Sequence, residues 1–330
     1  MEGARTIITG GAGFIGTHLA LKLLEKNAVV TVLALPTDDC SHLPDGIRIV
    51  RADVNSKADL AGVFGEQQFI FHLAARCDLD GTSIEDYRTN FVGTANVLRE
   101  IGSSPSIIRF VLYSTQLVAG IHNETRFINE TEPLKARTMY GESKILAERV
   151  TAELCSAYGI PYTIVRPTSV YGPYGNAPYE SFFRMIRDGR YVHFGAADNL
   201  VSMVYVKNLI DLTLLLSVLK EAENETYFGN DFHPYTMREF AETAAGFYKK
   251  RIRTIPVSVA VLAAYALGFL KLIGMDVPLY PVRLRNMRAN YCYDVQKAVR
   301  LGYLPRYDLR TGVYETLEWY EGNRWTQKTT

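Results

Sequence analysis

The stretch TGGAGFIG at residues 9–16 decides the fold of this chain, because a short apolar run precedes it and a helical pattern follows it. In a strand–turn–helix unit, Gly10 permits the tight turn, Gly13 lets backbone approach a pyrophosphate, and Gly16 lets the helix pack closely on the strand. Free N–H groups at the start of the helix favour an anion. A plain strand-to-helix turn would tolerate the same glycines. The order of elements favours a dinucleotide-binding loop with contacts from Gly10, Gly13, Phe14, Ile15 and Gly16.

Short apolar runs alternate with helical patterns through the first half of the chain, which indicates a parallel sheet covered by helices on both faces. The expected strands are residues 29–33, 47–50, 69–73, 110–113 and 162–165. The expected helices between them are residues 58–64, 87–101 and 143–158. We therefore predict an α/β fold, a doubly wound parallel sheet of the Rossmann type, with ligands at the carboxyl ends of its strands.

Beyond residue 174 the pattern loosens, and the tail is rich in Tyr, Arg and Pro. A strand–helix unit at about 203–219 repeats the alternation of strands and helices that is found in the first half of the chain. We expect a dinucleotide-binding domain of residues 1–174 and about 200–232. The remainder, about 175–199 and 233–330, would form a smaller C-terminal lobe that binds the substrate.

Composition excludes several classes of protein. A net charge of +1 gives no general field that would attract nucleic acid or an anionic membrane. The four cysteines are far apart, and the six histidines include no HExxH pair, so neither a disulfide scaffold nor a metal site is indicated. The first expected strand starts within a few residues of Met1, which leaves no room for a signal peptide and favours a cytoplasmic protein.

Residues 257–270 are almost wholly apolar. This run is shorter than the roughly 20 residues that a membrane-spanning helix needs. We therefore expect a buried or interfacial helix in the substrate-binding region, not a membrane span.

The stretch YGESK at residues 140–144 points to acid–base chemistry. Tyr140 and Lys144 are four residues apart at the start of a helix, so their side chains share one face. A free tyrosine has a pKa of about 10. The ammonium of Lys144 and an oxidised nicotinamide would both favour the phenolate and lower that pKa. Tyr140 could then exchange a proton with a secondary alcohol while hydride moves to or from the cofactor.

Ser114 and Thr115 stand at the end of the expected strand over residues 110–113. A hydroxyl at this place can hydrogen-bond a developing alkoxide and fix the substrate against Tyr140. The alternative is a hydroxyl that merely caps the strand end. This alternative applies more to Ser114 than to Thr115.

Together these pieces resemble the extended short-chain dehydrogenase/reductase family, which includes nucleotide-sugar epimerases and 3β-hydroxysteroid dehydrogenases, over nearly the whole chain. The motifs that carry the resemblance are TGGAGFIG at 9–16, Asp53-Val54, HLAA at 72–75, NFVGT at 90–94, Ser114-Thr115, YGESK at 140–144, Arg166-Pro167 and YGP at 171–173. The resemblance implies hydride chemistry with a catalytic set of Thr115, Tyr140 and Lys144, in which Asn90 assists a proton relay.

The resemblance also implies a set of cofactor contacts. Asp53 and Val54 would meet the adenine, and Ala74 and Ala75, with Leu73 beside them, would line the ribose path. Pro167 and Thr168 would lie near the nicotinamide, and Tyr140 and Lys144 would also contact the cofactor.

The expected strand over residues 29–33 ends at Ala34. Many relatives that use NAD have an acid at this place for the ribose hydroxyls. The nearest acids are Asp38 and Asp39, and no arginine or lysine follows closely to receive the 2′-phosphate of NADP. Because the two aspartates would repel that phosphate, the sequence favours NAD and leaves NADP open.

Several departures concern the reaction and the substrate. Gln116 and Leu117 stand where related sugar 4,6-dehydratases have an Asp-Glu pair, so dehydration has no evident acid and base. Ser169 stands where nucleotide-sugar members usually have an asparagine, and Val201 lies near the place of an arginine that grips a diphosphate. Two groups of arginines could still meet a diphosphate, although such clusters are more often solvated faces: Arg184, Arg187 and Arg190, and Arg283, Arg285 and Arg288.

Three hypotheses follow. The first, narrowly preferred for the breadth of sugar-using relatives, is a nucleotide-sugar 4-epimerase or keto-sugar reductase. The second is a 3β-hydroxysteroid dehydrogenase-like or other reductase of apolar carbonyl compounds, favoured by Ser169, Val201 and the apolar run. The third is a cofactor-sensing protein without catalysis. Amphipathic helices near 87–101 and 143–158 could pair across a homodimer.

Overall fold

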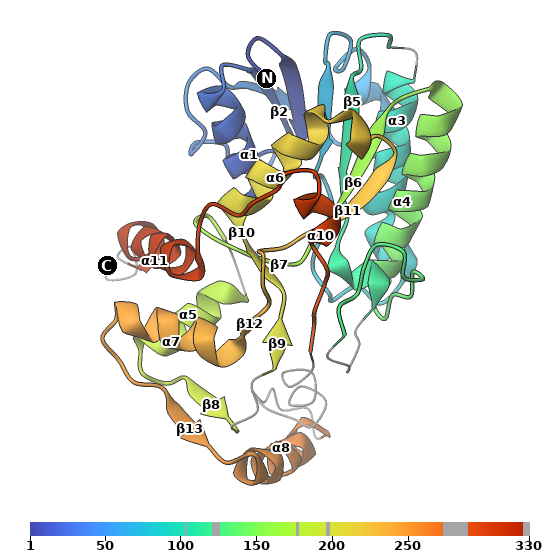
Figure 1. The fold of residues 1–330 in the computed structure, drawn as a ribbon. Helices are drawn as coiled ribbons and strands as arrows, with labels where there is room; N and C mark the ends of the chain where they lie inside the picture. Colours follow the sequence, from blue (N-terminus) through green and yellow to red (C-terminus); the bar gives the residue numbers. More distant parts are fainter. Residues whose placement is uncertain (103, 121–125, 176–177, 196–198, 273–289, 326–330) are drawn as a thin grey trace.

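The computed structural model describes residues 1–330 except 103, 121–125, 176–177, 196–198, 273–289 and 326–330. Its centre is a seven-stranded sheet in the order β11-β6-β5-β4-β1-β2-β3, in which all neighbouring strands are parallel (Figure 1). These strands are β1 (Arg5–Thr9), β2 (Val29–Ala34), β3 (Arg48–Arg51), β4 (Phe69–His72), β5 (Arg109–Tyr113), β6 (Tyr162–Pro167) and β11 (Glu225–Gly229). The predicted parallel α/β sheet is confirmed; the edge strand β11 was not predicted.

Helices cover both faces of the sheet, as the continuous apolar strands require. On one face lie α1 (Phe14–Glu25) and α6 (Val206–Val218), whose leucines share one buried cluster with β1 and β2. On the other face lie α3 (Thr94–Ile101) and α4 (Met139–Tyr158), packed against β4 and β5 (Figure 1). The carboxyl ends of the strands therefore form one open edge for ligands.

Two helix predictions are corrected. The helix expected over 58–64 is the short α2 (Lys57–Leu60), and Gly62, with a φ of +74°, continues the chain as a turn. The segment expected as one helix over 87–101 has three parts: a tight turn at Ile84–Tyr87, a wide π-helical turn at Thr89–Gly93, and α3. A Cβ at Gly93 would lie 2.7 Å from a methyl group of Val54, so this turn packs closely on the segment after β3.

The remaining elements form a second group beside the sheet. Its strands pair as β7 (Ser169–Tyr171) with β10 (Met203–Tyr205), β9 (Leu200–Val201) with β12 (Tyr235–Thr236), and β8 (Val192–Phe194) with β13 (Arg253–Ile255). Its helices include α5 (Tyr179–Arg187), α7 (Met237–Phe247), α8 (Val257–Leu272) and α11 (Leu309–Tyr320). Aromatic rings fill its core, and Phe14, at the start of α1, packs against this core from the sheet side. The short helix α10 (Gln296–Val299) packs instead on the sheet beside β11.

The apolar run forms α8, at the end of this group far from the sheet (Figure 1). Ala260 and Ala264 are buried, with Phe194 packed against them, whereas Leu262 and Tyr265 are 73% and 67% exposed. One face of the helix is thus buried and the other is not. Among the helices that the structure describes, none has the length and apolar character needed to cross a bilayer.

Candidate active site

The loop between β1 and α1 has the shape that the glycines predict. Gly10 has a φ of +67°, and a Cβ there would lie 2.9 Å from the backbone of Ala74. A Cβ at Gly16 would lie 2.6 Å from the carbonyl oxygen of Gly10, so the helix can approach the loop only with glycine. Gly13 caps α1 without any side-chain hydrogen bond, which leaves the first N–H groups of the helix for an anion. This loop fits a dinucleotide pyrophosphate.

A buried polar chain fixes the next loop beside the glycines. The Thr9 hydroxyl accepts the N–H groups of Leu73 and Ala74, each at 3.2 Å, and lies 2.8 Å from Nδ1 of His72. Nε2 of His72 lies 2.9 Å from the hydroxyl of Thr94. Burial lowers the pKa of His72 to about 3, with the charge of Lys144 contributing, so the ring is neutral. The predicted ribose-side residues are thereby held against the glycine loop.

Asp53 and Val54 follow β3 at the same edge of the sheet. The Asp53 carboxylate accepts the backbone and side-chain N–H groups of Asn55, at 2.9 and 3.0 Å. Val54 is buried against Gly93. This geometry leaves Val54 as an apolar wall and Asp53 as a carboxylate that already has internal donors.

The end of β2 holds a cation that sequence reasoning missed. Ala34 lies in register with Arg51 on β3. The Arg51 guanidinium donates to the carbonyls of Leu35 and Asp38, at 2.7 and 2.8 Å, and the Asp38 carboxylate accepts the Leu35 N–H at 2.9 Å. The turn after β2 therefore presents both a carboxylate and a guanidinium. Arg51 directly follows the expected strand over residues 47–50. Pairing that strand with the one over residues 29–33 would have placed Arg51 beside Ala34.

Tyr140, Lys144 and Thr115 come together where β5 ends and α4 begins. Thr138 caps α4 by accepting the N–H of Gly141 at 3.0 Å, which sets Tyr140 in the first turn. The hydroxyl of Thr115 is hydrogen-bonded to that of Tyr140. Lys144 is buried and its ammonium donates to the carbonyl of Tyr113 at 2.9 Å.

The titration of this group differs from the sequence-based expectation. Burial raises the pKa of Tyr140 above its ordinary value, the nearby Cys77 thiol adds to the rise, and the hydrogen bond with Thr115 opposes it. Burial also lowers the pKa of the Lys144 ammonium, against the opposing effects of Cys77 and Glu148. In the site without cofactor, desolvation outweighs the expected stabilisation of the phenolate.

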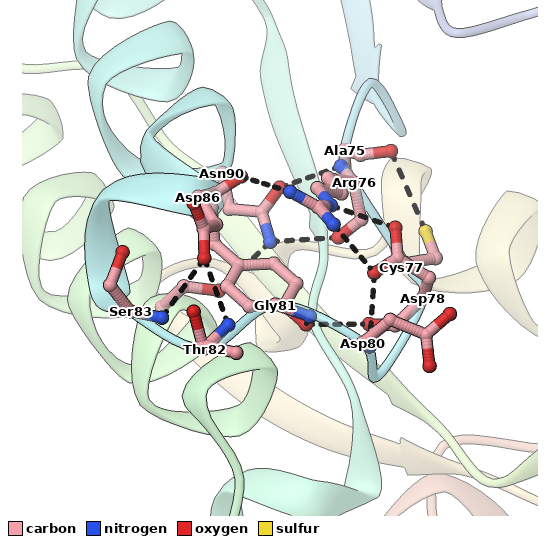
Figure 2. Close-up of polar contacts among 12 residues, drawn as sticks. Ala75, Arg76, Cys77, Asp78, Asp80, Gly81, Thr82, Ser83, Asp86 and Asn90 are labelled. Atoms are coloured by element: carbon pink, nitrogen blue, oxygen red, sulfur yellow. Dashed lines mark hydrogen bonds and ion pairs between the residues drawn. The ribbon is translucent and has the colours of Figure 1, made fainter.

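Asn90 holds the loop at Arg76 through its side-chain amide, and its part in a proton relay stays a prediction. Figure 2 shows its amide reaching back to Arg76: the side-chain oxygen accepts the Arg76 N–H at 2.8 Å, and the nitrogen donates to the Arg76 carbonyl at 3.0 Å. The same nitrogen donates to the hydroxyl of Ser143 at 2.8 Å. The Arg76 guanidinium pairs with Asp78 and lies over the ring of Tyr87, which contacts the ring of Tyr140. Asn90 thus fixes the loop that borders Tyr140.

A buried ion pair joins the two strands of the site to α4. Arg166 donates to the Glu148 carboxylate through Nε at 2.9 Å and Nη2 at 2.7 Å, and both side chains are almost fully buried. The hydroxyl of Ser114 donates to the same carboxylate. Ser114 therefore points into the protein, and Thr115 is the hydroxyl that meets Tyr140.

Pro167 and Thr168 follow Arg166 at the end of β6. The N–H and the hydroxyl of Thr168 both donate to the carbonyl of Gly229, at 2.9 and 3.1 Å. β11 thus fixes the segment that the resemblance places near the nicotinamide.

A cavity of about 310 Å³ opens next to these groups. Its wall consists mainly of aromatic and aliphatic side chains, with Gln116 and Ser169 joining it to the ends of β5 and β6. The lining residues are Gln116, Ser169, Pro178, Tyr179, Phe182, Tyr191, His193, Phe194, Asn199, Val201, Met203, Met237 and Tyr291. Gln116 is 9% exposed, and its side-chain oxygen has no hydrogen-bond partner in the structure.

Replacing Glu148 by Gln is expected to lower the free energy of unfolding by about 3–5 kcal/mol, because the Arg166 charge stays buried without a countercharge. The matched control is Glu225→Gln, which breaks the exposed pair with Lys297 and should cost about 1 kcal/mol or less. Urea denaturation of the two variants measures the difference. Equal, small losses would contradict the role assigned to the buried pair.

Comparison with known proteins adds to this geometry. A 3-beta-hydroxysteroid dehydrogenase from Mycolicibacterium neoaurum is 28% identical over 96% of this chain and 91% of its own length. A putative UDP-glucose 4-epimerase from Methanocaldococcus jannaschii is 26% identical over 97% of this chain and 99% of its own. The crystal structure of a UDP-glucose 4-epimerase from Thermotoga maritima, 22% identical, superposes with a TM-score of 0.78 over 96% of this chain and 99% of that one.

The family model described as the NAD-dependent epimerase/dehydratase family matches residues 6–227. This match covers the glycine loop, the Tyr140–Lys144 pair and the whole central sheet up to β11. It confirms the resemblance drawn from the motifs, and the family's dependence on NAD agrees with the predicted cofactor. The chain belongs to the NAD-dependent epimerase/dehydratase family.

Proposed function

We propose that this protein interconverts a secondary alcohol and a ketone on a largely apolar substrate, with NAD as hydride carrier. The observation that supports this proposal is the cavity beside Gln116 and Ser169: among the residues that the structure describes, neither an arginine nor a lysine lines it. A nucleotide sugar brings a diphosphate, and two negative charges entering such a wall would lose their hydration without a countercharge. The cavity therefore favours the second of the sequence-based hypotheses over the nucleotide-sugar hypothesis.

The arginines considered for a diphosphate support this choice. Arg184 pairs with Glu180 within α5. Arg187 pairs with Asp188 and lies over the ring of Trp325, 4.5 Å from its centre. Neither belongs to the cavity wall, and neither does Arg190. The second group, Arg283, Arg285 and Arg288, lies outside the residues that the structure describes.

The proposed chemistry assigns the proton to Tyr140. In the direction of oxidation, the Tyr140 oxygen takes the proton of the substrate hydroxyl; in reduction it returns it. Thr115, already hydrogen-bonded to Tyr140, would hold the same substrate oxygen. NAD, when bound at the glycine loop, supplies the acceptor for the hydride that leaves the substrate carbon. Lys144, fixed by the Tyr113 carbonyl, would add its positive charge beside Tyr140 and favour the phenolate during the reaction.

The nucleotide-sugar hypothesis remains the competing candidate for one reason: a relative of nearly equal similarity is named a putative UDP-glucose 4-epimerase. Both hypotheses use the same residues for the proton and the hydride. They differ in what fills the cavity.

Tyr140→Phe is expected to reduce kcat by at least about a hundredfold, because it removes the hydroxyl that exchanges the proton. NADH binding, followed by fluorescence titration, should change little. The control is Tyr158→Phe, at the exposed far end of the same helix, which should leave both quantities unchanged. A Tyr140→Phe enzyme with full turnover would refute the assigned chemistry and favour a protein that senses the cofactor without catalysis.

A substrate panel distinguishes the two hypotheses. We expect apolar cyclic secondary alcohols to reduce NAD in the presence of the enzyme, measured at the absorbance of NADH. They should also raise the melting temperature of the NAD-loaded protein, because ligands of the folded state stabilise it. UDP-glucose and UDP-galactose should do neither and should not interconvert. Stabilisation by the UDP-sugars alone would reverse the choice.

A further inference from the structure

Gln116 lies at the junction between the catalytic hydroxyls and the cavity. It follows Thr115 directly, and Thr115 is hydrogen-bonded to Tyr140. Gln116 lines the cavity and is only 9% exposed. The side-chain oxygen has no partner in the structure. A buried carbonyl oxygen that has lost its water and gained no donor is costly, and native proteins rarely leave one so.

The backbone of Gln116 is held rigidly. Thr115 caps the turn Gln116–Ala119 by accepting the N–H of Leu117 at 3.3 Å. The buried hydroxyl of Tyr293 contacts the carbonyls of Gln116 and Gly120, at 3.4 and 3.0 Å. The side chain is therefore presented from a fixed position, which is what recognition of a ligand group requires.

Two hydroxyl groups of the cavity wall have partners inside the protein. The hydroxyl of Ser169 is hydrogen-bonded to Tyr179, and the hydroxyl of Tyr191 lies 3.5 Å from Nδ1 of His193. Gln67 also has an unpartnered side-chain oxygen, but it lies just before the amino end of β4, away from the cavity. Gln116 combines burial, a side-chain oxygen without a donor and a place in the cavity wall directly after Thr115.

We propose that the Gln116 side-chain oxygen accepts a hydrogen bond from a second hydroxyl of the substrate, on a carbon close to the one that is oxidised. The inference rests on the proposed function for the identity of the reacting group and adds a specificity determinant to it. The substrates that use this contact are then apolar ring compounds with two neighbouring polar groups. In the direction of oxidation the substrate is a vicinal diol, and in the reverse direction it is a hydroxyketone.

The matched probes are cyclohexane-1,2-diol and cyclohexanol, which differ by that hydroxyl. With NAD and the full-length enzyme, we expect kcat/KM to favour the diol by about tenfold, the worth of one hydrogen bond to a buried group. Gln116→Met keeps the length of the side chain and removes the acceptor, so it should lower the ratio of kcat/KM for the diol to kcat/KM for cyclohexanol to about one. Gln116→Glu, which keeps an acceptor, should retain the preference.

Gln67→Met is the control for losing a buried amide elsewhere, and it should behave as the unaltered enzyme. A diol preference that survives in Gln116→Met overturns the proposal. The same pair is compared by the melting temperature of the NAD-loaded protein, so the test does not depend on turnover. A diol-specific stabilisation that vanishes in Gln116→Met supports the contact; equal stabilisation by both compounds, or none by either, overturns it.

The two readouts separate this proposal from the proposed function. Binding that depends on Gln116 without oxidation of either alcohol would refute the function and leave the contact standing. Oxidation of both alcohols that depends on Tyr140 but not on Gln116 would support the function and refute the contact.

Discussion

The Glu148–Arg166 ion pair is the constraint on which the geometry of the site depends. Glu148 lies one turn beyond Lys144 on α4, Arg166 directly precedes Pro167, and the third partner, Ser114, directly precedes Thr115. One carboxylate thus ties together the three segments that, in the proposed function, carry the proton-transfer group, its hydroxyl partner and the nicotinamide-side residues. Because both charges are buried, either one alone would be strongly destabilising, so the three segments hold their places jointly.

A second constraint acts on the cofactor side. The loop after β4 is held by Thr9 and His72 at its start and by Asn90 further along. Gly10 packs so closely on Ala74 that no side chain fits between them. The glycine loop and the loop that borders Tyr140 are therefore packed against each other, and Phe14 connects them to the aromatic core of the second group. In the proposed function, one network of short contacts thus positions both the hydride and the proton ends of the reaction.

Much of this could be predicted from the chain. The parallel sheet follows from alternating patterns, and the Tyr140–Lys144 pair follows from a spacing of four residues in a helix. What local patterns did not predict were the interactions with neighbours that are remote in sequence. The pKa of Tyr140 is set by burial, Asn90 is engaged by the Arg76 backbone, and Arg51 reaches the end of β2 from the adjacent strand. Local patterns carry none of these distances, because they arise only when strands pair and loops close.

The same distinction explains why the substrate was the weakest prediction. The many relatives that act on nucleotide sugars favoured a sugar substrate. The sheet and the Tyr–Lys–Thr set, however, are common to enzymes with very different substrates, so these features do not identify the substrate. Discrimination depends on the wall of the cavity, which β8, β9, β10, α5 and α7 build from residues 178–237 together with Tyr291. An aromatic wall gains free energy from each apolar carbon it covers but cannot replace the hydration of a diphosphate. On the proposal made here for Gln116, its buried amide orients an otherwise apolar substrate, because a hydrogen bond is directional whereas apolar contacts are not.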